Sequence, residues 1–371
     1  MSARLAGLGW VTPFGSTIEG VWAKLLAGEV ASASSLGDLL GEKNALAFRV
    51  PPEAVAEAAC HPRLRRSSAI SRFAVVAGLA ALRDAGLELD AAAAARTALV
   101  FAISNGGVIY TKRFFHEIVK SGAQAASPLL FPETVFNAPA SHLASILGIT
   151  GASYTLVGDG AVGILALKMA EDLMANPDLD HCLVVGAEEV DWLLCDAYRQ
   201  WRLLRAKPPL EPFARPARGT VLSEGAGAVL LAREGAVALE RIHPGGNFAR
   251  QRELVRLLGE IGRDLAADGP TDLLVASANG TFVDAAERSV AERYFPDAAI
   301  FTAKPALGES VAAGGIWQVI CAAQALRKQE LPPLLGAPAD FGLTREKKRW
   351  RRALVTTCGL NQQVAALALR R

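Results

Sequence analysis

A glycine-rich turn in the middle of the chain has the spacing of a reactive or anion-binding site. Residues 154–157 predict a short β-strand, Gly158-Asp159-Gly160 predict a tight turn, and residues 164–174 predict an apolar helix. The backbone N–H groups at a helix start converge on one point, where enzymes place nucleophiles or bind anions. The residue at the apex is Gly160, which has no side chain to act as a nucleophile.

The same turn matches the dinucleotide-binding pattern G-x-G-x-x-G through Gly158, Gly160 and Gly163. That motif normally opens a domain and is followed after about 20 residues by an acidic residue at the end of the next strand. Here the motif lies in mid-chain, and Glu188, after the next predicted strand, comes too late. The sequence therefore favours a different use of the turn, and we expect no cofactor.

Composition and cysteine spacing exclude several other classes. The net charge of the 371-residue chain is only +2, which does not favour nucleic-acid binding. No apolar run reaches the roughly 18–20 residues that span a bilayer, and no signal peptide opens the chain. We therefore expect a cytoplasmic protein without membrane association. The cysteines show no C-x-x-C spacing and no histidine cluster, so we expect reduced, buried thiols and no metal site. They are Cys60, Cys182, Cys195, Cys321 and Cys358.

Strand and helix signals alternate along the chain, which predicts α/β layers with buried strands. The predicted strands are 3–8, 98–103, 154–157, 182–187, 226–231, 273–276 and 354–357, and the clearest helices are 73–84, 164–174 and 315–327. A similar short motif occurs twice, each time at the end of a predicted strand: AISNGG at 102–107 and ASANGT at 276–281. The repeated motif predicts a duplicated fold, with halves at 1–242 and 243–371 that bring both Asn-Gly loops to a shared cleft.

Four segments, in order along the chain, resemble the β-ketoacyl synthase family. They are GLGWVTPFGSTIEGVWAKLLAG at 7–28, RRSSAISRFAVVAGLAALRDAGL at 65–87, LGITGASYTLVGDGAVGILAL at 147–167 and EPFARPARGTVLSEGAGAVLLA at 211–232. The resemblance implies a thiolase-like α/β fold, with duplicated halves in a five-layered αβαβα sandwich that is usually dimeric.

The resemblance also implies where a catalytic triad would stand, and all three positions differ here. The family's nucleophilic cysteine aligns with Gly160, its first histidine with Asn279 in ASANGT, and its second with Glu309, whereas Lys304 is retained. A glycine cannot form an acyl thioester. Asn279 can still donate a hydrogen bond, but an ionised Glu309 would repel the enolate that two imidazoles stabilise in the family. A structural ion pair between Lys304 and Glu309 is the simpler interpretation.

The resemblance places the acyl pocket mouth at Cys358, Gly359, Leu360 and Asn361. Cys358 is either a displaced nucleophile or a packing residue, and packing is favoured because a strand end offers no helix N-terminus and no histidine. Asp159 is either a base or a helix cap, and acidic residues at helix starts favour the cap.

Two basic clusters match the family's use of positive surface to dock an acidic acyl carrier protein. One contains Arg63, Arg65 and Arg66, and the other, at 345–352, contains Arg349 and Arg351. Ordinary solvated charge is the alternative interpretation.

Together these features predict a non-catalytic ketosynthase-like subunit of the chain-length-factor type. It would pair with an active β-ketoacyl-acyl carrier protein synthase as a heterodimer, or with itself, in fatty acid, polyketide or polyene biosynthesis. Two alternatives stay open. One is a β-ketoacyl synthase or acyltransferase rewired around Asp159, Glu309 or Cys358, and the other is a module that binds an acyl chain or a carrier.

Overall fold

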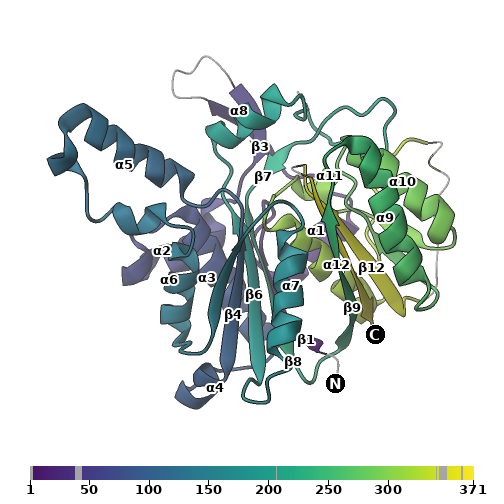
Figure 1. The fold of residues 1–371 in the computed structure, drawn as a ribbon, viewed down its shortest axis with the longest axis horizontal. Helices are drawn as coiled ribbons and strands as arrows, with labels where there is room; N and C mark the ends of the chain where they lie inside the picture. Colours follow the sequence, from purple (N-terminus) through teal and green to yellow (C-terminus); the bar gives the residue numbers. More distant parts are fainter. Residues whose placement is uncertain (1–2, 38–43, 206, 340, 342–348, 361) are drawn as a thin grey trace.

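A ten-stranded mixed sheet forms the frame of the protein (Figure 1). The computed structural model describes residues 3–37, 44–205, 207–339, 341, 349–360 and 362–371. The strands of the large sheet are β1 (Arg4–Val11), β4 (Thr97–Ile103), β5 (Ser153–Val157), β6 (His181–Glu188), β8 (Gly225–Ala232), β9 (Val237–Asn247), β10 (Leu273–Val275), β11 (Ala299–Phe301), β12 (Arg352–Cys358) and β13 (Gln363–Arg370). A smaller sheet contains β2 (Ala33–Gly37), β3 (Asn44–Phe48) and β7 (Leu222–Ser223).

The strand order repeats, which confirms the predicted duplication. The order is β5-β4-β6-β8-β1 in the first half and β11-β10-β12-β13-β9 in the second. In each half the first two pairings are parallel and the last two antiparallel. The halves join where β1 meets β9, at Leu5 and Val237. The division at 242/243 lies within β9 and stays a prediction.

Helices complete a five-layered αβαβα arrangement, as predicted. The helices are α1 (Ile18–Leu26), α2 (Ala56–Cys60), α3 (Ala69–Asp84), α4 (Ala91–Ala95), α5 (Val108–Ser121), α6 (Ala138–Leu147), α7 (Val162–Leu173), α8 (Trp192–Gln200), α9 (Gln251–Ala266), α10 (Val283–Tyr294), α11 (Lys304–Leu307) and α12 (Gly314–Lys328). In the outer layers, α3 and α6 cover the first half, and α9 and α10 cover the second. Between the two halves of the sheet lie α7 and α12 (Figure 1).

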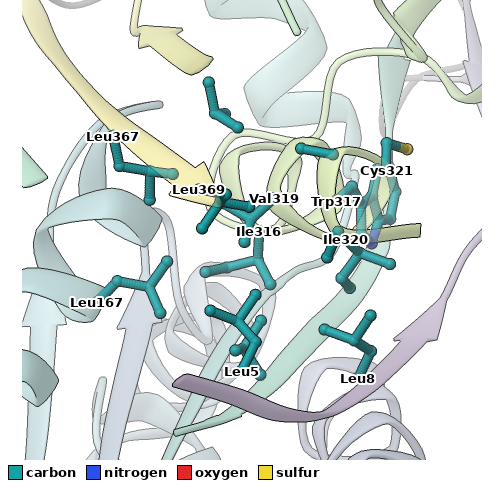
Figure 2. Close-up of a cluster of buried hydrophobic side chains, with 14 of the residues drawn as sticks. Leu5, Leu8, Leu167, Ile316, Trp317, Val319, Ile320, Cys321, Leu367 and Leu369 are labelled. Carbon is teal, nitrogen blue, oxygen red and sulfur yellow. The ribbon is translucent and has the colours of Figure 1, made fainter. Parts of the chain in front are cut away.

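The middle layer contains the largest apolar core and fixes the position of the central site. In α12 every residue from Gly314 to Leu326 is buried, as expected for a helix with no polar face. Its Ile316 and Trp317 pack among leucines of α7, β1 and β13 (Figure 2). A Cβ at Gly227 would lie 2.6 Å from Ile316 Cγ2, so a glycine is needed for this close approach.

Most of the predicted elements are confirmed to within a few residues, but several helices were not predicted, including the 16-residue α9 and the 14-residue α5. The predicted strands and helices all occur, although β10 ends at Val275 and α3 begins at Ala69. Among the helices that were not predicted, α5 stands out from the body of the molecule (Figure 1) and has no buried residue. Short 3-10 helices flank this region: η1 (Pro52–Val55), η2 (Pro62–Leu64), η3 (Ala123–Ala125) and η4 (Phe131–Thr134). Within the described ranges, no helix has the length and apolarity that crossing a membrane requires.

Candidate functional site

The glycine turn joins β5 to α7, as the sequence predicts. The N-cap position of α7 is Ala161, which makes no side-chain cap bond. Asp159 contributes its backbone carbonyl, which accepts the N–H of Val162 at 2.8 Å. Capping of α7 by the Asp159 side chain stays a prediction. The Asp159 carboxylate is buried within the packing of this turn.

Backbone from the other half fills the space in front of Gly160. A Cβ at Gly160 would lie 2.9 Å from Gly359 Cα and 3.4 Å from the Cys358 carbonyl oxygen. A Cβ at Gly359 would in turn lie 1.7 Å from Asp159 Oδ2. The turn and the end of β12 therefore interlock through two glycines and one carboxylate. The apex has no room for a nucleophilic side chain unless the backbone moves.

Asn279 meets Lys304 and Glu309 in the second half, although it comes from a different segment of the chain. The Asn279 Nδ2 donates to Glu309 Oε2 at 2.7 Å, and the Lys304 Nζ lies 2.8 Å from the same oxygen. All three side chains are buried. The predicted ion pair between Lys304 and Glu309 is therefore confirmed. Burying either charge alone would be costly, so each of the two side chains needs the other as its partner.

The polar atoms of this cluster are occupied by neighbours within the chain. Lys304 Nζ also donates to the Ser277 carbonyl at 2.9 Å and lies 3.3 Å from Ser277 Oγ. The Asn279 Oδ1 accepts from Thr281 Oγ1 at 2.6 Å. A network whose donors and acceptors already have partners rigidifies the core and has little left to offer a substrate.

Two buried acids on α10 hold the second Asn-Gly loop, and sequence reasoning missed both. Asp284 accepts the N–H groups of Phe213, Asn279 and Gly280, and Glu287 accepts the N–H of Ser277. Burial raises the pKa of Asp284 to about 6 and that of Glu287 to about 7. Their spacing, three residues apart and so on one face of a helix, is the signal that could have found them.

Glu188 holds the first Asn-Gly loop in the same way. Its carboxylate accepts the N–H of Ser104 at 3.1 Å and that of Asn105 at 3.3 Å. Burial raises the pKa of Glu188 to about 8, against the lowering effect of these two bonds. The acid that the dinucleotide pattern would require after the second strand is therefore used to support the loop.

The structure separates the predicted pocket-mouth residues. Cys358 is buried, and burial raises the pKa of its thiol well above the ordinary value, which agrees with a packing role and not with an activated nucleophile. Gly359 lies against Asp159 in the interlocked turn. Leu360 lines a groove of about 390 Å³ with Trp201 and other uncharged residues. Asn361 lies outside the described residues.

The arginines predicted for carrier docking lie on two parts of the surface. Arg63, Arg65 and Arg66 are exposed around η2, just before α3. Arg349 and Arg351 are exposed next to the start of β12, while most of the basic run before them lies outside the described residues. In the described part of the chain, no cluster of histidine, cysteine and acidic residues could hold a metal ion.

The layered architecture and the central turn define a protein of the thiolase-like fold. Residues 5–236 match the family model of the β-ketoacyl synthase N-terminal domain, so the chain belongs to the β-ketoacyl synthase family. With 3-oxoacyl-(acyl-carrier-protein) synthase 2 of Vibrio cholerae it is 24% identical over 234 residues, which are 61% of this chain and 56% of that protein. The match therefore spans little more than half the length of that relative.

Two further relatives match nearly end to end. The ketoacyl synthase beta subunit of the tetracenomycin polyketide synthase of Streptomyces glaucescens is 28% identical, and the match covers 99% of this chain and 98% of that subunit. The solved structure of the ishigamide ketosynthase/chain length factor superposes with a TM-score of 0.83 and 20% identity, over 100% of this chain and 98% of that one. At this identity, the structural match shows a shared fold.

Proposed function

We propose that this chain is a non-catalytic, chain-length-factor type subunit that pairs with an active β-ketoacyl-acyl carrier protein synthase in fatty acid, polyketide or polyene biosynthesis. The observation that carries the proposal is the interlocked turn: the position that the resemblance assigns to the nucleophile is Gly160, and Gly359 packs directly against it. Covalent acyl transfer needs a nucleophile at that point, and this chain has neither the atom nor the space for one.

The charge at the centre supports the same proposal. In the family, two imidazoles donate hydrogen bonds to a developing enolate, and here Asn279 and Glu309 stand in their places. The Asn279 amide donates to Glu309 instead, at 2.7 Å. A carboxylate beside the reacting carbon would raise the energy of an enolate, because both carry negative charge. We infer that decarboxylative condensation takes place on a partner chain.

The surface of the first half supports a partner chain. Exposed apolar side chains gather on α5, η4 and β5, and they are Phe115, Val119, Phe131, Tyr154 and Val157. Strand β5 is also an edge of the large sheet, with a free hydrogen-bonding side. Large apolar residues on an open strand edge and a projecting helix are typical of protein interfaces. An active ketosynthase is the occupant that we propose, and a second copy of this chain is the alternative.

Carrier docking is the second part of the proposal. The names of the relatives link two of them to an acyl carrier protein or to polyketide synthesis. We propose that the exposed guanidinium groups of Arg63, Arg65 and Arg66, with Arg349 and Arg351, attract an acidic carrier. We also propose that the halves at 1–242 and 243–371 act as one unit in this complex.

Co-expression with an active ketosynthase encoded beside this chain tests the proposal. We expect the two chains to purify as a stable complex, and we expect the product length of the ketosynthase to change or its activity to fall when this chain is left out. The proposal is wrong if this chain purifies alone while the ketosynthase is fully active and gives the same product lengths without it.

Two matched valine substitutions locate the interface within that experiment. Val119→Asp on α5 places a charge in the proposed interface and is expected to abolish co-purification. The control, Val255→Asp, introduces the same charge at an exposed valine on α9, in the second half of the chain. It is expected to leave the complex intact. A complex that survives Val119→Asp would place the interface elsewhere, and loss of the complex in both variants would contradict an interface confined to the first half.

The groove at Leu360 favours a second candidate function, a module that binds an acyl chain. Its walls include Trp201, Leu203, Phe248 and Phe282, and none of the described residues that line it is charged. Native mass spectrometry that shows a lipid bound to this chain alone would support that function. A covalent acyl adduct after incubation with acyl-carrier thioesters would instead favour the rewired enzyme.

A further inference from the structure

The segment 107–137 of the first half buries one residue, and that residue is charged. The segment contains α5, η3 and η4, and we call it the α5 arm. Of its residues, all of which the structure describes, only Glu133 is buried, with 6% of its surface exposed. The side chains of Phe115, Val119 and Phe131 are 56–82% exposed. Folded chains usually bury apolar side chains and leave carboxylates in water, so the burial of Glu133 requires a specific cause.

The Glu133 carboxylate joins the α5 arm to two helices of the body. Its Oε2 accepts the backbone N–H of Ser68, the N-cap residue of α3, at 2.9 Å. Its Oε1 lies 2.7 Å from Nε2 of His142 on α6. Burial would raise the pKa of Glu133, but these bonds hold that pKa below its ordinary value, so the carboxylate is ionised at neutral pH. An ionised carboxylate only accepts, so His142 Nε2 carries the hydrogen, and both bonds are charge-assisted.

The backbone of Glu133 also packs against the start of α5. A Cβ at Gly107, the N-cap residue of α5, would lie 2.0 Å from the Glu133 carbonyl oxygen, so this close approach needs a glycine. Thr111 Oγ1 on α5 lies 3.4 Å from the carbonyl oxygen of Thr134, the next residue of η4. Glu133 therefore brings α3, α6 and the start of α5 together around one side chain.

The other contacts between the α5 arm and the body hold α5 and are partly open to water. The Tyr110 hydroxyl donates to a backbone carbonyl before α3 at 3.3 Å, and Lys112 Nζ lies 3.7 Å from the centre of the Trp192 ring. None of these three side chains is fully buried, so water competes with both contacts. Within the arm, the rings of Phe114 and Phe131 are 5.7 Å apart, so the position of η4 also sets that of α5.

We propose that Glu133 is a positioning residue, whose buried carboxylate holds the α5 arm in the orientation that a partner chain recognises. A carboxylate anchor leaves the apolar side chains of the arm free for the partner, whereas an apolar anchor would bury some of them in the body. An arm that is fixed before association loses less conformational entropy on binding, which strengthens the complex. The role in recognition rests on the proposed function, whereas the fixing of the arm is a property of this chain alone.

Hydrogen–deuterium exchange of the isolated chain tests whether Glu133 fixes the arm. In Glu133→Ala we expect the amides of η4 and of the first turns of α5 to exchange at least about tenfold faster, because two charge-assisted bonds no longer oppose local opening. Amides of α12, in the middle layer, should keep their wild-type rates. Unchanged exchange in the arm would overturn the proposal. Faster exchange throughout the chain, α12 included, would also overturn it, because Glu133 would then be a general stability residue.

Two further variants separate the anchor from the loss of any carboxylate. Glu133→Gln keeps an oxygen for the Ser68 N–H and an amide for His142, so it should restore most of the protection. Glu117→Ala removes another carboxylate of the α5 arm, and we expect less than about a twofold change in exchange. Equal acceleration by Glu117→Ala, or no recovery in Glu133→Gln, would show that the hydrogen bonds of Glu133 do not set the arm.

Binding to a ketosynthase encoded beside this chain tests the role in recognition. We expect Glu133→Ala to bind at least about tenfold more weakly than the wild type, and Glu133→Gln to bind nearly as well as the wild type. Equal binding by Glu133→Ala, with a loosened arm, would overturn the role in recognition and leave the proposed function intact. If the wild-type chain itself does not bind a ketosynthase, the proposed function fails and the role in recognition with it, while the exchange rates still decide whether Glu133 fixes the arm.

Discussion

The centre of the molecule and the surface of its first half treat charged side chains in opposite ways. At the centre, Lys304 and Glu309 are buried 2.8 Å apart, and Asn279 completes their hydrogen bonds. Between the start of α3 and α5, a cavity is lined by four guanidinium groups that form no ion pair among the described residues, although Glu189 interacts with one of them; they are those of Arg65, Arg66, Arg72 and Arg113. Matched buried charges stabilise the centre, whereas the cations at the surface give the first half a positive potential.

The two Asn-Gly loops show the same contrast between the halves. Each follows the strand next to the edge of its half, β4 or β10, and each has backbone N–H groups bound by a buried acid, Glu188 in the first half and Asp284 in the second. The first loop leads into α5, which has no buried residue, and the second leads into α10, which packs into the core. Equivalent loops therefore lead into an exposed helix in the first half and a packed helix in the second.

Breaking the central ion pair should have the largest effect. Lys304→Met leaves the Glu309 carboxylate buried without its cation, and we expect a loss of about 3–5 kcal/mol in the free energy of unfolding. The loss is measured by denaturant titration. The double variant Lys304→Met/Glu309→Gln should recover most of it, because no uncompensated charge remains. Lys168→Met, which removes an exposed helical pair, is the control and should cost less than about 1 kcal/mol. If Lys304→Met and Lys168→Met lost the same free energy of unfolding, the buried pair would be no more important than the exposed one.

Restoring the aligned nucleophile should cost stability without creating activity. The Cβ of Gly160→Cys would collide with Gly359, and overpacking of this kind costs about 1–3 kcal/mol. We expect no condensation and no acyl adduct by intact mass spectrometry, since Asn279 and Glu309 still occupy the two imidazole positions. Gly246→Cys has ordinary contacts at 3.6 Å and is the matched control for stability. Measurable condensation by the Gly160→Cys variant would show that the centre has kept its chemistry.

The buried acids should make the protein less stable as the pH rises. Burial raises the pKa of Glu188 from its ordinary 4.5 to about 8, so the folded chain holds a proton that the unfolded chain releases at lower pH. Stability from this group is full below about pH 4.5 and is lost as the pH rises through 8, by at most about 1.4 kcal/mol per unit. Unfolding midpoints at about pH 6 and about pH 8 measure the slope.

Glu188→Gln should flatten that pH profile, whereas the exposed Glu57→Gln should leave it unchanged. A glutamine keeps an acceptor for the Ser104 N–H and has no proton to lose. A wild-type stability that increases between about pH 6 and about pH 8 would show that the buried acids are not the dominant titrating groups.

The smallest effect is expected on α5. Val119→Ala changes a side chain that is 82% exposed, and we expect less than about 0.5 kcal/mol on the unfolding of the isolated chain. Val319→Ala on α12 removes the same atoms from a fully buried position and should cost several times more. If the two valines cost the same, the surface of the first half would be part of the core.

The sequence predicted the layered fold because its strands and helices are long and clearly patterned. It also predicted the ion pair between Lys304 and Glu309, because five residues in one segment keep the two side chains close. It did not predict α5, whose apolar residues face solvent in this chain, so that no buried stripe marks the helix. The acids on α10 were missed because no helix was predicted there, and without its turn nothing placed the two carboxylates against the loop just before it.

The sequence by itself determined the fold class, the family resemblance and the absence of a side chain at Gly160, since these depend on residue types and local order. Only the tertiary structure decided that Gly359, nearly 200 residues further along the chain, fills the space in front of that glycine. It alone also brought Arg113 of α5 to the arginines before α3. Both contacts join distant segments, and side-chain packing, which no local pattern records, sets them.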